Sequence, residues 1–471
     1  MKDRALILPE TFFPKCEDPF KWQSPAGLFS LSVIVLFAIV HFAADMLPGL
    51  NNLQRPGSGA PSGTQMEYAW IAAKGIAFRI SVVLLAIPLV GSFYKFLRSL
   101  EPRRLQKALL ISFLVFIILS ILCFPYNDGG GLRSMGTDYG VISSDPFAVK
   151  SGFFYRRLLQ PGIANVLGFG GAHLYYLFTM GVTYLLILTT TIAMQRWLSS
   201  SLSVTSSESP SVSLKQLGKD DAWIFLVVLS AATASFIAFH FQFPGYPEQI
   251  GYICLLIMAF VPMRPQTRWS AVALALASHE IMIFALTPVI VFCFRSLKER
   301  AVALAIVGLY GLLWLAAYRF QFPALVSVHT DLAPAVNTID IFLTNIPWVT
   351  LGALAAHKLL WGTLVWVAIS LLRQRQFHAV LALASLTLTP LATLVVAADT
   401  SRLAGLGFLG ILLSIAILCR TAEYVWERSL LRGLLALNVL LPSVYISANY
   451  HRIPCPGLYE FVIGRMSQFL G

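Results

Sequence analysis

Runs of about 20 mostly apolar residues recur along the whole of this 471-residue chain. A hydrocarbon core about 30 Å thick needs about 20 helical residues to cross, and a helix satisfies its own backbone hydrogen bonds in lipid. Hydrophobic residues make up 57% of the chain and charged residues only 12%, which is about half the charged share of a soluble domain. The sequence therefore predicts an all-α fold, a polytopic transmembrane helical bundle.

The apolar segments also predict the number of spans. We expect about 11 to 13 membrane spans, counting one pair of short helices as a hairpin. The segments fall at residues 28–48, 67–94, 107–124, 165–195, 221–240, 247–263, 269–294, 302–318, 348–372, 378–398, 403–419 and 431–447.

Most basic residues lie in short clusters between these segments, and such clusters mark cytoplasmic loops. The net charge of +12 therefore reflects membrane orientation and does not indicate a partner nucleic acid. This orientation places the long segment 125–164 on the outer face. It also flanks the segment 269–294 with basic residues on both sides. Because one span cannot have both ends inside, we expect two short helices whose turn falls at Ser278-His279-Glu280.

The outer segment carries the first group of candidate functional residues. Its carboxylates suit a general base or a metal ligand, and its arginines suit a phosphate. The alternative is a solvated loop whose arginines bind lipid headgroups, although long loops in compact proteins tend to be functional. The residues are Asp128, Asp138, Asp145, Tyr155, Arg156 and Arg157.

Ionisable residues inside apolar segments form the second group, because each costs about 2.5–3.5 kcal/mol at the centre of a membrane helix. His279 and Glu280 form either part of a polar cavity or a buried pair that joins helices by hydrogen bonds. We expect a cation to hold Glu280 ionised, and His279, Lys358 and Arg402 are the candidates. Lys358 lies well inside its apolar segment and must snorkel or find a partner.

Asp399 and Arg402 form a third site between two apolar runs. They are three residues apart, so their side chains share a face on a helical turn. One interpretation is a local ion pair at the start of a helix, and the other is a phosphate-binding arginine held by its own aspartate. The chain has no Walker A sequence, no HExxH and no CxxC pair, so its motifs indicate neither a nucleotide site nor a zinc site.

Three stretches together resemble the bacterial integral-membrane glycosyltransferases of the GT-C superfamily, over roughly residues 107–420. "DYGVISSDPFAVKSGFFYRRLLQP" is similar to the first large outer loop of that family, in which an aspartate precedes a Tyr-Arg pair and a proline. "MRPQTRWSAVALALASHEIMIFALTPVIVF" is similar to its pair of short helices joined by a polar tip. "ADTSRLAGLGF" resembles the Asp-x-x-Arg turn before a late helix.

The resemblance implies transfer of a sugar from a polyprenyl-phosphate donor to an acceptor at the outer face of the membrane. Asp138 matches the family's base or metal ligand, with Asp145 as the second candidate. The resemblance makes Arg156, Arg157 and Arg402 candidates to bind the donor phosphate. The cofactor is left open, with a divalent cation as the candidate, and so is any metal site. The residues expected to line the cavity are Tyr155, His279, Glu280, Lys358 and Asp399.

The resemblance also divides the chain into a tail with two extra spans (1–106), a catalytic transmembrane core (107–420) and a C-terminal span with an outer tail (421–471). The implied partners are a polyprenyl-phosphate-linked sugar and membrane lipid, in the bacterial inner membrane. Two other functions stay open. A polysaccharide polymerase or O-antigen-ligase-like enzyme would use a similar donor without needing Asp138. A transporter or flippase would show broken helices in matching positions of two halves.

Overall fold

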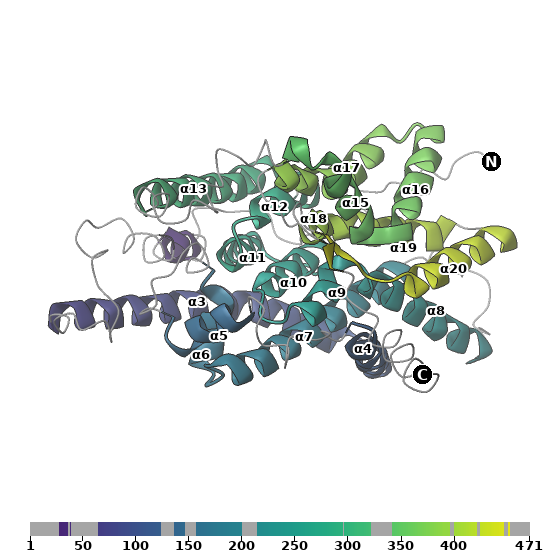
Figure 1. Ribbon diagram of the computed structural model, residues 1–471. Coiled ribbons are helices and arrows are strands. Elements are labelled where there is room, and N and C mark those ends of the chain that lie inside the picture. The colour runs from purple at the N-terminus through teal and green to yellow at the C-terminus, as the bar shows by residue number, and fades with distance from the viewer. Residues whose placement is uncertain are drawn as a thin grey trace.

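The computed structural model shows a bundle of helices with one small pair of strands (Figure 1). The structure describes the chain in blocks separated by gaps. The described residues are 28–35, 38, 65–123, 136–146, 157–199, 214–294, 296–321, 342–395, 400–421, 424–446 and 451–452.

Within these residues, six helical stretches are long and apolar enough to cross a membrane. A seventh is added if helices α8 (Leu214–Ala232) and α9 (Ser235–Gln242), which meet at a bend of 64°, count as one span. The chain is therefore a multi-pass membrane protein with an all-α bundle. The six stretches are Gly75–Ser99, Pro102–Leu122, Ala172–Leu198, Ile346–Arg373, Phe377–Leu394 and Thr400–Thr421.

This number is lower than the predicted 11 to 13 spans, so that prediction is not met in the described part of the chain. One reason is that several apolar segments form helices too short to cross, such as α10 (Glu248–Phe260) and α12 (Met282–Cys293). A second is that the segment 28–48 is described only in part. Apolar composition identified the buried and lipid-facing segments but could not say where helices break.

The remaining helices and strands complete the bundle. Their bounds are α3 (Gln65–Ser99), α4 (Pro102–Leu122), α5 (Gly136–Ser144), α6 (Leu159–Val166), α7 (Ala172–Ser199), α8 (Leu214–Ala232), α9 (Ser235–Gln242), α11 (Pro265–Ser278), α13 (Leu297–Gln321), α15 (Ile346–His357), η4 (Lys358–Leu360), α16 (Trp361–Arg373), α17 (Phe377–Leu388), η5 (Thr389–Val395), α18 (Thr400–Ala404), η6 (Gly405–Gly407), α19 (Phe408–Thr421), α20 (Val425–Leu440), β1 (Tyr445–Ile446) and β2 (His451–Arg452). β1 and β2 pair antiparallel.

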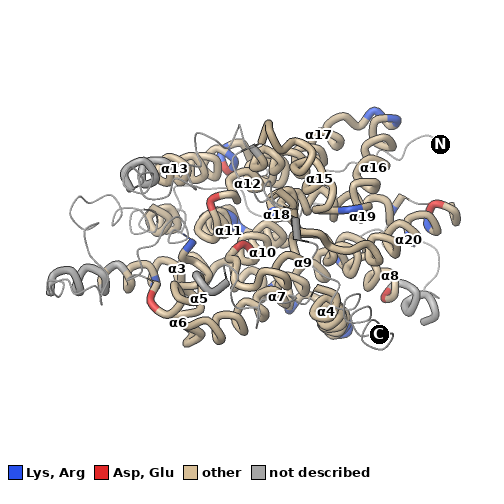
Figure 2. The backbone as a smooth tube through the Cα atoms, viewed as in Figure 1, with Lys and Arg blue, Asp and Glu red and all other residues tan. Residues whose placement is uncertain are grey.

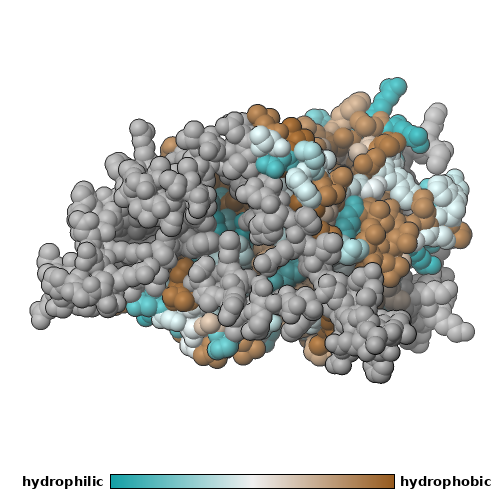
Figure 3. Space-filling model, in the orientation of Figure 1, coloured by the Kyte–Doolittle hydropathy of each residue, from teal (hydrophilic) through white to brown (hydrophobic). Residues whose placement is uncertain are grey.

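The helices differ sharply in how much they are covered by the rest of the protein. In the apolar 18-residue core of the stretch Thr400–Thr421, 94% of the residues are buried, whereas the share is 28% in each of the corresponding cores of Gly75–Ser99 and Pro102–Leu122. Large apolar side chains therefore remain exposed along α3 and α4, as expected of helices that face lipid. In the space-filling view, brown apolar residues likewise lie on the described surface (Figure 3). The stretch that contains α18 and α19 thus lies at the centre of the bundle.

The predicted hairpin of two short helices is confirmed. α11 and α12 are separated by a turn at residues 279–281, and His279 has the extended backbone that ends α11. The start of α11 lies close to the end of α12: the Arg268 guanidinium is 5.4 Å from the centre of the Phe294 ring. Arg268 also pairs with Glu299 at the start of α13, at 3.2 Å. Both ends of the hairpin therefore lie at the same level of the bundle.

Helix α10 packs closely against the tip of this hairpin at Gly251. A Cβ atom at this glycine would lie 2.6 Å from Ser278 Oγ and 2.6 Å from the Met282 methyl group. A larger residue would require the side chains of Ser278 and Met282 to move. Glycine therefore permits the approach that brings the first turn of α10 beside His279.

Two other segments differ from their predicted structure. The outer segment 125–164 is not all loop, because it contains α5 and the start of α6. The apolar segment 348–372 is not one straight helix, because it breaks at Lys358, whose φ is 51°. Such a backbone is unfavourable for a residue with a Cβ atom, so helix α15 must end there. Sequence periodicity gave no sign of this break.

Candidate functional site

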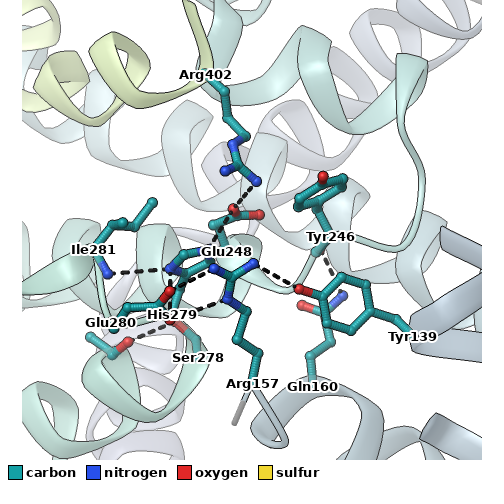
Figure 4. Close-up of polar contacts among 11 residues, drawn as sticks. Tyr139, Arg157, Gln160, Tyr246, Glu248, Ser278, His279, Glu280, Ile281 and Arg402 are labelled. Carbon is teal, nitrogen blue, oxygen red and sulfur yellow. Dashed lines mark hydrogen bonds and ion pairs between the residues drawn. The ribbon is translucent and has the colours of Figure 1, made fainter. Parts of the chain in front are cut away.

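Charged residues are sparse along the backbone, and several of them lie near α10 and α11 (Figure 2). Here four parts of the chain meet: α5, the residues just before α6, the first turn of α10 and the tip of the α11–α12 hairpin. Arg402, from α18, approaches the same point from the opposite side (Figure 4). The site is therefore built from segments that are far apart in the sequence.

Arg157 and Glu280 form the strongest contact of the site. The guanidinium donates from Nη2 to Glu280 Oε1 at 2.5 Å and from Nε to Oε2 at 3.1 Å. Such two-point pairs are stronger and more directional than single hydrogen bonds. Nη1 donates in turn to the hydroxyl oxygen of Tyr139 on α5, at 3.0 Å. One arginine thus ties α5 to the hairpin tip.

His279 lies between two carboxylates. Its Nδ1 accepts a hydrogen bond from the backbone N–H of Ile281 at 3.2 Å, so the pattern of donors assigns the ring proton to Nε2. Nε2 faces Glu248 Oε1 at 3.4 Å. Nδ1 also lies 3.2 Å from Glu280 Oε2, but this carboxylate is held there by Arg157 and receives no proton from the ring. We therefore assign His279 as a neutral spacer between Glu280 and Glu248.

Arg402 meets the other side of Glu248. Its Nη1 donates to Glu248 Oε1 at 3.0 Å, and its guanidinium lies 4.6 Å from the centre of the Tyr246 ring and 5.6 Å from that of Phe239. Both distances are typical of cation–π contacts. A charge contact and two aromatic faces therefore hold this arginine.

The turn before α10 is itself held in place. Gly245 has a φ of 111°, which a glycine adopts readily. The Tyr175 hydroxyl donates to the Gly245 carbonyl at 2.9 Å, and Gln160 Nε2 donates to the Tyr246 carbonyl at 3.3 Å. Tyr246 and Glu248 thus start from a backbone that α6 and α7 fix.

The burial of the site leaves one edge open. The side chain of Glu280 is 18% exposed and that of Arg157 is 8% exposed. His279, Glu248 and Arg402 are nearly fully buried. Two guanidinium groups and two carboxylates compensate each other in charge, as buried ions require. Glu280 is therefore the most accessible group of the network.

The structure brings together several residues that the sequence analysis named from separate segments. Arg157, His279, Glu280 and Arg402 all belong to the network. Arg157 is the cation that pairs with Glu280, and it was not among the three expected candidates. Of those candidates, His279 lies beside Glu280 at 3.2 Å, but as a neutral ring. Lys358 donates to the carbonyl of Leu441 at 3.0 Å, so it is not the cation that pairs with Glu280.

The remaining predicted residues are placed only in part. Asp138 lies on α5 immediately before Tyr139, and its side chain is outside the described residues. Asp145 is exposed just after the end of α5. Four other predicted residues lie outside the described residues: Asp128, Tyr155, Arg156 and Asp399. The expected contact between Asp399 and Arg402 is therefore untested.

Sequence reasoning missed two members of the network, Glu248 and Tyr139. Glu248 carried a usable signal, because it is the one acidic residue between Phe241 and Met263. Tyr139 carried none, since a tyrosine beside an apolar stretch is common in membrane proteins. Among the described side chains, no three His, Cys, Asp or Glu residues converge so as to hold a metal ion.

Comparisons with known proteins add no relative. No protein-family model, no curated protein and no solved structure matches this chain. The function is therefore argued from the geometry of the site.

Proposed function

We propose that the protein is a membrane glycosyltransferase that moves a sugar from a polyprenyl-phosphate donor to an acceptor at the outer face of the membrane. The observation that best supports this proposal is the contact of Arg157 with both Tyr139 and Glu280. It joins the segment that begins with Asp138 to the hairpin tip. These are two of the three stretches on which the resemblance to the GT-C superfamily rests, and Arg402 comes from the third.

The chemistry of such a transfer fits these residue types. A glycosyl phosphate already carries a good leaving group, so the acceptor hydroxyl needs a base and the departing phosphate needs cations. Asp138 is the proposed base, because it precedes Tyr139 on α5. Arg157 is the proposed phosphate ligand, since it lies at the open edge of the network.

The variant Asp138→Asn tests this function. The purified protein in lipid nanodiscs is given a panel of short-chain polyprenyl-phosphate sugars together with a panel of acceptors that carry free hydroxyl groups, and the release of polyprenyl phosphate is measured. We expect Asp138→Asn to lower the turnover rate by more than about a hundredfold, which corresponds to about 2.7 kcal/mol of barrier. The comparison is Asp145→Asn, which removes the second candidate base, an exposed carboxylate just beyond the same helix. If Asp138 is the base, this variant should stay within about threefold of wild type.

The other results are equally informative. A loss confined to Asp145→Asn would move the base to that residue. Asp138→Asn activity within about tenfold of wild type would remove Asp138 from the reaction. Lack of release by the wild-type protein from every donor in the panel would contradict the transferase function.

A transporter or flippase for lipid-linked sugars is the second candidate, and two helix breaks favour it. α8 and α9 meet at 64°, and α15 ends at Lys358 inside an apolar stretch. Broken helices bind substrates near the midplane of many transporters. Movement of a fluorescent lipid-linked sugar across proteoliposomes, with no release of polyprenyl phosphate, would favour this function over transfer.

A further inference from the structure

Glu248 is fully buried and contacts two other parts of the chain, the hairpin tip and α18. It lies in the first turn of α10, where the helix dipole favours a negative charge. One of its oxygens, Oε1, lies 3.0 Å from Arg402 Nη1 and 3.4 Å from His279 Nε2. A single carboxylate oxygen thus links α18 to the hairpin tip.

Arg402 needs such a fixed partner, because its own helix is short. α18 has five residues, and the hydroxyls of Thr400 and Ser401 contact the backbone of Ile446 on β1. These contacts place the backbone of α18 but do not aim the guanidinium. The turn Gly245–Glu248 orients the guanidinium instead: its central carbon lies over the ring of Tyr246, and its Nη1 donates to Glu248.

The network also relates the two arginines to each other. From Arg402 it runs through Glu248, His279 and Glu280 to Arg157 (Figure 4). A displacement of Glu248 would therefore change both the aim of Arg402 and the position of the histidine beside the Arg157–Glu280 pair.

We propose that Glu248 is a positioning residue: it fixes the guanidinium of Arg402, the second arginine that the resemblance makes a candidate to bind the phosphate group of the ligand. This inference rests on the proposed function only in taking a lipid-linked phosphate as the ligand. It extends that function by naming a residue that touches no substrate and yet sets the affinity for it.

The test measures binding of a short-chain polyprenyl monophosphate, without sugar, to the full-length protein in nanodiscs. Glu248→Gln keeps the size of the side chain and removes its charge, and it should raise the Kd at least about tenfold. In the transfer assay the same variant should raise the KM for the donor and leave kcat within about threefold, because the lost contact acts on binding.

A matched control separates positioning from mere stability. Gln249 is the buried neighbour of Glu248 on the same turn, and it contacts Thr183 of α7 instead of the network. Gln249→Met should lower the midpoint of thermal unfolding and leave the Kd unchanged. If Glu248→Gln behaves in the same way, with a lower midpoint and the wild-type Kd, the residue is structural only and the proposal is wrong.

A double-mutant cycle covers the case in which Glu248→Gln leaves Arg402 stranded and the protein unfolds. The variant Glu248→Gln/Arg402→Gln removes both charges. If Glu248 acts through Arg402, the double variant and Arg402→Gln alone should bind the phosphate equally weakly, within about threefold. Independent, additive losses would overturn the proposal.

The two proposals can fail separately. Wild-type protein that binds the phosphate and transfers no sugar contradicts the transferase function and leaves the role of Glu248 standing. Wild-type transfer together with unchanged binding by Glu248→Gln contradicts the role of Glu248 alone. A wild-type protein that does not bind the phosphate overturns the positioning role itself.

Discussion

Arg157 and Glu280 lie 123 residues apart in the chain and meet in a two-point ion pair. Arg157 precedes α6, and Glu280 is at the turn between α11 and α12. The side chain of Glu280 is 18% exposed and is the most open in the network, so the pair forms the most accessible edge of the network.

Glu280→Gln should destabilise the protein, because it leaves the buried charge of Arg157 without its carboxylate. Breaking one partner of a buried pair typically costs about 3–5 kcal/mol. The midpoint of thermal unfolding in nanodiscs gives the check. Glu101→Gln is the control, since it removes an exposed carboxylate that lies 3.8 Å from Arg104 and should change the midpoint little. Equal midpoints for the two variants would show that the Arg157 pair adds no stability.

Tyr139→Phe should weaken the link between α5 and the hairpin tip. The change removes the hydroxyl that accepts from Arg157 Nη1, and hydrogen bonds to charged groups contribute about 1.5–3 kcal/mol. We expect a lower unfolding midpoint and faster hydrogen exchange in α5. Tyr176→Phe removes a hydroxyl from a partly exposed tyrosine on α7 and is the control. Unchanged exchange in α5 would mean that other contacts hold this helix.

Arg268 and Glu299 form a second buried pair, which closes the base of the hairpin. Their side chains are 1% and 3% exposed. Arg268→Met or Glu299→Met alone strands a charge and should cost about 3–5 kcal/mol, whereas the double variant should recover much of that loss. Denaturation of the three variants measures the coupling. Phosphate binding should be the same in the double variant and the wild type, because this pair is separate from the site; additive losses of stability would disprove the coupling.

The topology of the hairpin gives a prediction that does not depend on function. Gln266 is near the start of α11, and Leu297, which is 81% exposed, begins α13. Gln266→Cys and Leu297→Cys, each in a background without native cysteines, should react with a membrane-impermeant thiol reagent from the same side. The basic flanks predict the cytoplasmic side. Labelling from opposite sides would exclude the hairpin in the membrane.

The sequence by itself determined the class of the protein and the position of one unusual element. Apolar runs of span length have one solution in lipid apart from a closed β-barrel, namely helices, and the structure is an all-α bundle. Basic residues on both sides of 269–294 predicted a hairpin with its turn at residues 278–280, and the structure has α11 and α12 separated by a turn one residue later, at 279–281. Both inferences depend on local properties of the chain, namely the length of its apolar runs and the charge of the residues that flank them.

The tertiary structure alone decided which ionisable residues meet. Nothing in the sequence relates Arg157 to Glu280 or Arg402 to Glu248, because these partners are separated by 123 and 154 residues. Spacing suggested Asp399 as the partner of Arg402 and Lys358 as a candidate for Glu280, whereas packing carried Lys358 to the carbonyl of Leu441. Local spacing can predict a shared helix face, but a contact between distant helices depends on how α10, α11 and α18 pack. The close approach at Gly251, which brings α10 to the hairpin tip, is set by that packing.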